Sequence, residues 1–224
     1  MEPNNTTRTL SLLLSFVAGF CDTVTFVAAG ELFSAHVTGN FIVFAYDVIK
    51  HPQMEAWQKL ITFPVFIISI MVGGRINKSS RNMYALLTFE GILLLLSGLA
   101  AFFINDTDPT QWQILLIAMA IVVALGFQNT FGKLFAKATY GLTTVMTGNV
   151  TQASIDLVKV FATKPFDLDA WGSLKKQSVL IGGFFLGCLL GALIAAKFGL
   201  SAVILPGGLL LLWRGMNKVS PTNT

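Results

Sequence analysis

The stretches ILLLLSGLAAFFI (residues 92–104) and ILLIAMAIVVALGF (residues 114–127) decide the fold class of this chain. Neither stretch contains a charged residue. With their flanks, both are long enough to cross a hydrocarbon core about 30 Å thick as helices. We therefore expect an all-α, polytopic membrane protein.

The composition of the whole chain agrees with this. Charged residues make up only 12% of the 224 residues, which is about half the fraction of an ordinary globular chain. The polar connections are short, so residues 1–224 are expected to form a single transmembrane domain, multi-pass in the cell membrane and in contact with the lipid bilayer. The net charge of +4 is too small to indicate a nucleic-acid partner and is ordinary for a protein with Lys and Arg in its cytoplasmic loops.

The chain contains an internal repeat. Hydropathy divides it into eight apolar segments, at residues 10–29, 37–49, 60–74, 83–104, 114–131, 142–161, 178–196 and 198–213. Three motifs recur in the same order: GFCDT (19–23) as GFQNT (126–130), TGN (38–40) as TGN (147–149), and EGILLL (90–95) as PGGLLL (206–211). One shared tripeptide proves nothing, but three in order at nearly constant offset predict a duplication, with repeats at residues 10–104 and 112–213.

The positions of Lys and Arg favour six crossings over eight. Eight full crossings would divide these fifteen residues nine against six, which is not a positive-inside pattern. If the first two segments of each half together make one discontinuous crossing, ten lie on one side and three on the other, with Lys133 and Lys137 at the breaks. We therefore expect six crossings, cytoplasmic termini and two inverted halves. Because residues 10–29 alone are long enough to span a bilayer, eight crossings stay open.

A Thr-Gly-Asn motif stands near the start of the second segment of each half, at residues 38–40 and 147–149. Thr is a competent helix N-cap, and Gly lets another group approach the backbone closely. The helix that follows the first motif is too short to cross, so it would begin inside the membrane and expose free N–H groups. Matching interrupted segments of this kind point to a central site in transporters built from inverted repeats. The alternative is a cap at the membrane surface with a glycine that serves close packing.

Two acidic residues lie within apolar segments, where an unpaired carboxylate costs about 3 kcal/mol or more. Asp22 is the first candidate for a coupling or substrate-binding acid, with His36 as a partner for its proton and Glu90 as a second acid. Neutral hydrogen bonds would come from Thr38, Asn40, Gln128, Asn129, Thr147 and Asn149. The alternatives are that Asp22 caps or ends a helix near the surface and that Glu90 reaches the headgroups from near a helix end.

Two further groups of residues have a structural and a functional interpretation. A stripe of small residues at helical spacing predicts a helix-packing face, with a homo-oligomer contact as a further use: Gly182, Gly183, Gly187 and Gly191. Lys133 and Lys137 are expected to be solvated loop lysines, and attraction of an anion is the alternative.

The motifs resemble those of the YoaK family, which are bacterial integral membrane proteins with a domain of unknown function. The resemblance rests on Gly-Phe-x-Asp-Thr at residues 19–23, Leu-Phe-x-Ala-His-x-Thr-Gly-Asn at residues 32–40 and the second Thr-Gly-Asn, and it covers nearly the whole chain. It implies a membrane location and a multi-helix fold, and it names no substrate. In the second half Gln128 and Asn129 stand where the first half has Cys21 and Asp22, so an acidic role is confined to one half.

These observations predict a small secondary transporter or permease for a small polar or anionic solute, with proton coupling as the simplest energy source. The alternative is a non-transporting interaction or sensing protein in which the polar motifs hold helices together. We do not expect an enzyme, because the sequence contains no Walker loop, HExxH, GxSxG or CxxC motif. Two histidines are too few for a histidine-rich metal site, so we expect neither a cofactor nor a metal.

Overall fold

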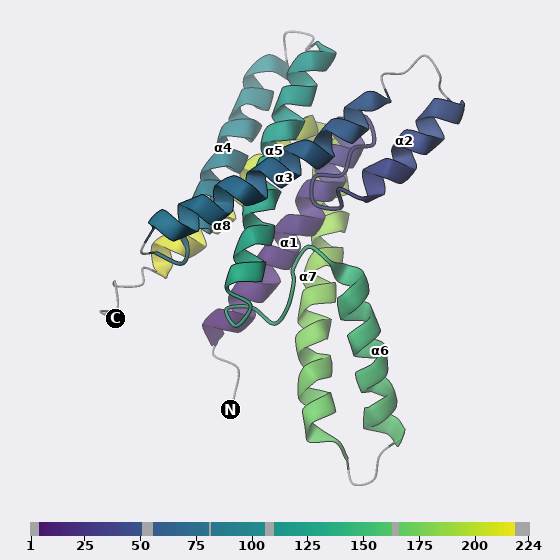
Figure 1. Cartoon of the computed structure of the whole chain (residues 1–224), viewed down its shortest axis with the longest axis vertical. Coiled ribbons are helices and arrows are strands. Elements are labelled where there is room, and N and C mark those ends of the chain that lie inside the picture. The colour runs from purple at the N-terminus through teal and green to yellow at the C-terminus, as the bar shows by residue number, and fades with distance from the viewer. Residues whose placement is uncertain (1–4, 51–55, 81, 106–109, 163–165, 218–224) are drawn as a thin grey trace.

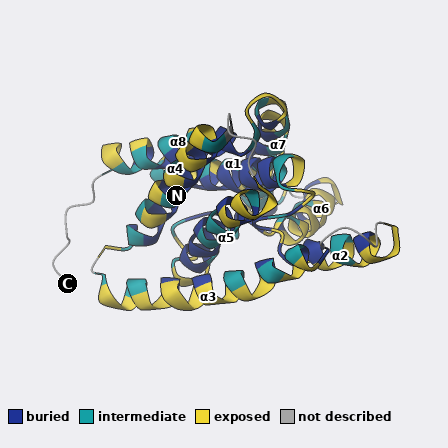
Figure 2. Ribbon diagram, turned by 90° about the horizontal axis from the view of Figure 1, so that it is seen from above, coloured by how far each residue is buried: buried dark blue, intermediate teal, exposed yellow. Residues whose placement is uncertain are grey.

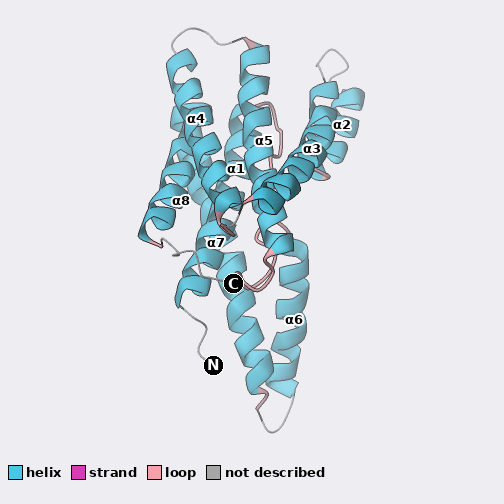
Figure 3. Ribbon diagram, turned by 60° about the vertical axis from the view of Figure 1, so that its left-hand side comes forward, coloured by secondary structure: helices cyan, strands magenta, loops and turns pink. Residues whose placement is uncertain are grey.

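The computed structural model describes residues 5–50, 56–80, 82–105, 110–162 and 166–217. All the regular secondary structure in this part of the chain is helical, and it contains no strand (Figures 1 and 3). Its elements are α1 Asn5–Ala28, α2 Gly39–Lys50, α3 Trp57–Ser79, α4 Ala85–Asn105, α5 Gln111–Leu134, α6 Met146–Ala162, α7 Leu168–Phe198, the 3-10 helix η1 Gly199–Val203 and α8 Ile204–Met216.

Five stretches of helix are long and apolar enough to cross a membrane. The fifth, Leu168–Met216, contains α7, η1 and α8. The chain turns between α7 and α8 at Gly199, whose φ of 56° is in the left-handed region that favours glycine. α7 begins ten residues before the predicted apolar segment, since Asp167 caps it by accepting a hydrogen bond from the Ala170 N–H at 2.9 Å. The expectation of an all-α polytopic membrane protein is confirmed.

Burial separates central from outer helices. In the most apolar windows of α1 and α5, 67% of the residues are buried inside the protein, against 17% in α3. Large apolar side chains of α3, such as Ile68 and Met71, are exposed. Figure 2 shows that much of α3 is exposed. An exposed apolar surface of this kind suits contact with lipid, so α1 and α5 form the core around which the other helices pack.

The predicted interruptions are present in both halves. The first interruption is the ten residues 29–38 between α1 and α2, and the second is residues 135–145 between α5 and α6. Each half then has the same order of helices: a long one, a shorter one after the break, a long one and a final one. In Figure 1, α1 and α4 run upward, whereas α5 and α8, which occupy the matching places in the second half, run downward.

The two halves are packed into each other. α1 of the first half lies on α7 of the second, α5 of the second half lies on α3 of the first, and α4 lies on α8. Recurring glycines stand at these crossings. A Cβ atom added at Gly19 would overlap the backbone of α7 at Phe184, and one added at its counterpart Gly126 would overlap Ser69 of α3. Neither half therefore has a complete packing surface by itself.

The glycine stripe of α7 is a packing face within the chain. An added Cβ at Gly187 would overlap the Phe16 carbonyl oxygen of α1, and added Cβ atoms at Gly183 and Gly191 would lie 2.9 and 2.8 Å from the carbonyl oxygens of Leu12 and Phe20. These three glycines are buried under α1, so the idea that they form a homo-oligomer contact is corrected. Of the predicted stripe, Gly182 has no atom within 4 Å of an added Cβ.

A methyl group at Gly187 is expected to separate α1 from α7. Gly187→Ala should lower the free energy of unfolding by about 1–3 kcal/mol, because the added carbon meets backbone that cannot turn away. The measurement is thermal unfolding of the purified protein in detergent. Gly182→Ala is the matched control on the same helix, where open space and better helix propensity should leave stability unchanged or slightly higher. Equal melting of the two variants would contradict the intrachain crossing.

Candidate functional site

The first interruption is held by the Asp22 carboxylate. α1 ends where Gly30 and Glu31 adopt left-handed backbone conformations, with φ values of 67° and 61°. The following extended segment then passes Asp22, whose side chain is buried. Asp22 Oδ1 accepts hydrogen bonds from the Ala35 N–H at 2.5 Å, the His36 N–H at 3.2 Å and the Ser34 hydroxyl at 3.3 Å. One carboxylate thus supplies acceptors for backbone donors that no helix satisfies.

Asn40 closes the same interruption from the start of α2. Its side-chain amide accepts a hydrogen bond from the Phe33 N–H and donates one to the Phe33 carbonyl, both at 2.8 Å. It also donates to Thr62 Oγ1 of α3 at 2.9 Å. The asparagine of the Thr-Gly-Asn motif therefore fastens the extended segment to α2 and α3.

A buried lysine of α3 adds a third fastening, which the sequence did not predict. Lys59 donates a hydrogen bond to the Gly30 carbonyl and lies 3.6 Å from a carboxylate oxygen of Asp47 in α2. Both charged side chains are almost fully buried. The only signal available in the sequence was a pair of opposite charges twelve residues apart, which is too common to identify a buried pair.

The second interruption is fastened by related contacts. Asn149 Nδ2 donates to the Leu142 carbonyl at 2.9 Å, across the same seven residues that separate Asn40 from Phe33. Gln128 of α5 donates to Thr143 Oγ1 at 2.7 Å and to the Leu14 carbonyl of α1 at 2.8 Å.

α1 supports both interruptions. Besides its carbonyl at Leu14, its Ser11 hydroxyl accepts a hydrogen bond from the Tyr140 N–H of the second interruption at 2.9 Å. Asp22, further along the same helix, holds the first interruption. The two interruptions therefore meet different turns of one helix.

The nine predicted site residues do not form one cluster of free polar groups. Asp22, Asn40, Gln128 and Asn149 are buried and engaged as described, whereas His36, Thr38 and Thr147 are exposed. The His36 ring packs edge-on against Phe33, and only its backbone N–H bonds to Asp22. Asn129 is half-buried, and its side chain makes no hydrogen bond with any described residue. Proton sharing between Asp22 and His36 stays a prediction.

Glu90 is in a different situation from Asp22. It is fully buried in α4, and neither carboxylate oxygen has a hydrogen-bond partner among the described residues. On the same helix, Leu87 belongs to one hydrophobic cluster and Leu94 to another, and these clusters also draw on α1 and α5.

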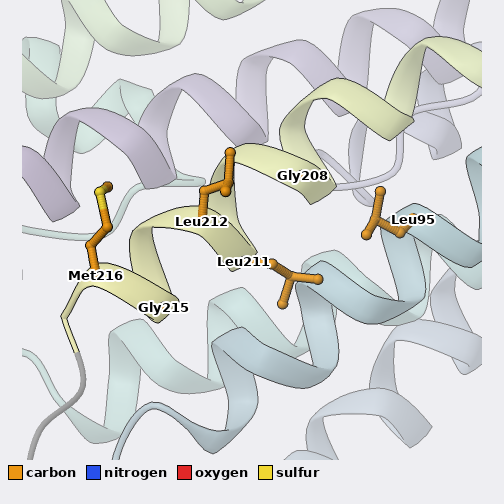
Figure 4. A pocket seen from close by; sticks show the side chains of 6 residues that line it. All are labelled: Leu95, Gly208, Leu211, Leu212, Gly215 and Met216. Carbon is orange, nitrogen blue, oxygen red and sulfur yellow. The ribbon is translucent and has the colours of Figure 1, made fainter.

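A pocket of about 500 Å³ between α4 and α8 does not suit a polar ligand (Figure 4). Its lining consists only of Leu95, Gly208, Leu211, Leu212, Gly215 and Met216. Such a surface offers no side-chain hydrogen bond, and an acyl chain would fit it better than a solute. No group of three or more His, Cys, Asp or Glu side chains in the described ranges is placed to hold a metal ion.

Loss of the Asp22 carboxylate is expected to destabilise the fold. Asp22→Ala leaves the buried donors of Ser34 and Ala35 without an acceptor, at about 1–3 kcal/mol for each, and also removes the acceptor of the partly buried His36 N–H. The variant should melt well below wild type in detergent, with Asp22→Asn in between because one acceptor oxygen remains. Asn129→Ala, at the matching position of the second half, is the control and should melt as wild type. Wild-type melting of Asp22→Ala would show that these bonds do not hold the interruption.

Comparison with known proteins identifies the family of this chain. Residues 10–215 match the family described as "Protein of unknown function (DUF1275)". The "UPF0700 transmembrane protein YoaK" of Bacillus subtilis (strain 168) is 25% identical over 156 residues, which are 67% of this chain and 67% of that protein. No solved structure matches the chain significantly. Since the family match spans nearly its whole length, this chain belongs to the DUF1275 family of membrane proteins, the YoaK family that its sequence motifs predicted.

Proposed function

We propose that this protein is a small secondary transporter for a small polar or anionic solute, coupled to protons and located in the cell membrane, and that it is not an enzyme. The observation that carries the proposal is Glu90, a fully buried carboxyl group whose two oxygens have no hydrogen-bond partner in the part of the chain that the structure describes. An acid in such a place inside a membrane protein is costly and is a functional site by default. It would hold a proton in one state of the protein and release it in another.

The proton-binding role is assigned to Glu90 rather than to Asp22. The Asp22 carboxylate already accepts hydrogen bonds from Ser34, Ala35 and His36, which hold the first interruption in place. Protonation of Asp22 would weaken the first interruption. Glu90 carries no such structural duty among the described residues, so a change in its charge leaves those contacts in place.

An inverted repeat with six crossings is part of the proposal. Its support is the opposite direction of α1 and α5 and of α4 and α8, together with the packing of each half onto the other. Charge placement gives further support. Among the described residues, seven basic side chains belong to the end of the bundle where α1 begins and α8 ends: Arg8, Arg75, Lys78, Lys159, Lys175, Lys176 and Arg214. Three belong to the opposite end: Lys50, Lys59 and Lys197. By the positive-inside rule the first end is cytoplasmic.

One observation favours the second candidate, a membrane-embedded interaction or sensing protein without flux. The polar side chains of the interruptions already have structural partners, because Asp22, Asn40 and Asn149 all form hydrogen bonds with neighbouring backbone. In a transporter these bonds keep the interrupted helices in place around Glu90. In a non-transporting protein, the motifs would serve only to form these structural hydrogen bonds.

Cysteine accessibility tests the six-crossing topology. In a background with Cys21→Ala and Cys188→Ala, Ser79→Cys at the end of α3 and Asn217→Cys after α8 should react with a membrane-impermeant maleimide only after the cells are opened. Thr110→Cys, at the exposed N-cap of α5, should react in intact cells. Placement of Ser79 and Asn217 on opposite sides, or of Ser79 outside, would refute the proposed arrangement.

A proton-flux assay tests transport and the role of Glu90. Proteoliposomes loaded with a pH-sensitive dye are challenged with pooled small polar and anionic solutes. Wild type should give a solute-dependent proton signal, and Glu90→Gln should abolish it without lowering the melting temperature, since Glu90 has no partner to lose. Ser97→Ala is the matched control, because Ser97 is a buried, unpartnered and uncharged group on the same helix.

The outcomes separate the two candidate functions. A full proton signal from Glu90→Gln would remove Glu90 from the mechanism. Silence of folded wild-type protein across a broad solute pool would refute transport and leave the interaction or sensing role.

A further inference from the structure

An open pocket with a volume of about 1230 Å³ lies between the start of α1, the second interruption and the first turns of α7. It is large enough for a small-molecule ligand, whose sites usually measure about 300–1,000 Å³. Its lining residues come largely from the start of α1 and the first turns of α7, which lie at the end of the bundle where most of the described basic residues are found (Figure 1). None of the nine predicted site residues lines it, but Lys137, for which the sequence left attraction of an anion as the alternative, does.

The lining of this pocket is strongly basic. Arg8 of α1, Lys137 of the second interruption and Lys175 and Lys176 of α7 stand against one acid, Asp169. Four positive charges less one negative charge leave a net charge of +3. None of the four cations forms a salt bridge with a described residue, and all four are exposed. Their charge is therefore available to a ligand that enters from water.

Two of the lysines lie over aromatic rings, and hydroxyl groups also line the pocket. The Lys175 Nζ lies 5.0 Å from the centre of the Trp171 ring, and the Lys176 Nζ lies 6.0 Å from that of Tyr140. The Arg8 guanidinium is within electrostatic range of the Tyr140 hydroxyl. Hydroxyl groups of Thr7 and Ser173 add further hydrogen-bond donors. Cations resting on rings are partly pre-organised, which reduces the cost of ordering them around a ligand.

We propose that this pocket binds a phosphate-bearing anion. A phosphate ester carries a charge of about −1 as a diester and about −1.5 to −2 as a monoester, and its oxygens accept hydrogen bonds, so it matches the cations and hydroxyl donors that line the pocket better than a neutral solute does. The volume leaves room for an organic group attached to the phosphate. The proposal concerns binding alone and does not depend on transport.

A ligand in this pocket would contact residues of the second interruption, which line it. Tyr140 belongs to both, because its ring meets Lys176 while its N–H donates to Ser11 of α1. Two residues further on, the Leu142 carbonyl accepts the hydrogen bond from Asn149. An anion held by Lys176 and Arg8 would thus lie beside the segment that connects α5 to α6.

The phosphate can come from two sources, a soluble phosphate ester or the headgroup of an anionic lipid, and the test distinguishes them. Glycerol 3-phosphate is titrated into the purified full-length protein in neutral detergent by calorimetry, with glycerol as the uncharged control. Retention of phosphatidylglycerol over phosphatidylcholine is measured separately by native mass spectrometry. Neither measurement needs an ion gradient, so a failure of transport does not affect them.

The variants remove equal charge inside and outside the pocket. The pocket variant carries Lys175→Gln and Lys176→Gln, and the control carries Arg75→Gln and Lys78→Gln at the exposed end of α3. We expect at least about a tenfold rise in the Kd for glycerol 3-phosphate, or an equivalent loss of retained phosphatidylglycerol, in the pocket variant only. Arg8→Gln, on a different helix, should act in the same direction if the double variant folds poorly.

Each outcome has a defined meaning. A selective loss of glycerol 3-phosphate binding supports a soluble ligand, and a selective loss of phosphatidylglycerol alone supports a lipid headgroup. Equal losses in the pocket and control variants, or the absence of both kinds of binding in wild type, would overturn the proposal.

Discussion

A bilayer offers no hydrogen-bond partners, so every backbone group at an interruption of a membrane helix must find one inside the protein. This chain has two interruptions, and side chains supply much of what the missing helical turns do not. Asp22 serves three donors in the first, and Asn40 binds both backbone atoms of Phe33. Asn149 repeats the asparagine contact in the second half across the same seven residues. The asparagine contact is therefore present in both interruptions, whereas the aspartate contact of Asp22 is present in the first one.

α1 forms hydrogen bonds with both interruptions. Asp22 holds the first interruption, while Ser11 and the Leu14 carbonyl hold parts of the second. Its crossing with α7 is so close that only glycine fits at Gly19 and Gly187. A rearrangement of either interruption therefore acts on a helix that also carries the other. This arrangement suits a protein in which events at one end are passed to the other, as transport or sensing requires.

The two buried acids, Asp22 and Glu90, differ in their role: Asp22 has a structural role, and Glu90 is the candidate for a chemical one. Asp22 accepts hydrogen bonds from three donors and stabilises a backbone conformation, whereas the two carboxylate oxygens of buried Glu90 have no hydrogen-bond partner among the described residues. A carboxyl group of the second kind changes its charge with little consequence for the fold, and one of the first kind does not. The basic pocket at the start of α1 adds a region of opposite charge that lies outside this pair.

The sequence by itself determined the fold class, the positions of both interruptions and the family, because apolar length, short motifs and their order are local properties of the chain. It also singled out Asp22 and Glu90, since charges in apolar segments are visible without a structure. Only the tertiary structure decided what each acid does. The donors of Asp22 lie up to fourteen residues away and arrive there through the turn at Gly30 and Glu31. The buried pair of Lys59 and Asp47 and the burial of the α7 glycines depend on helices from separate parts of the chain, whose contacts no local pattern records.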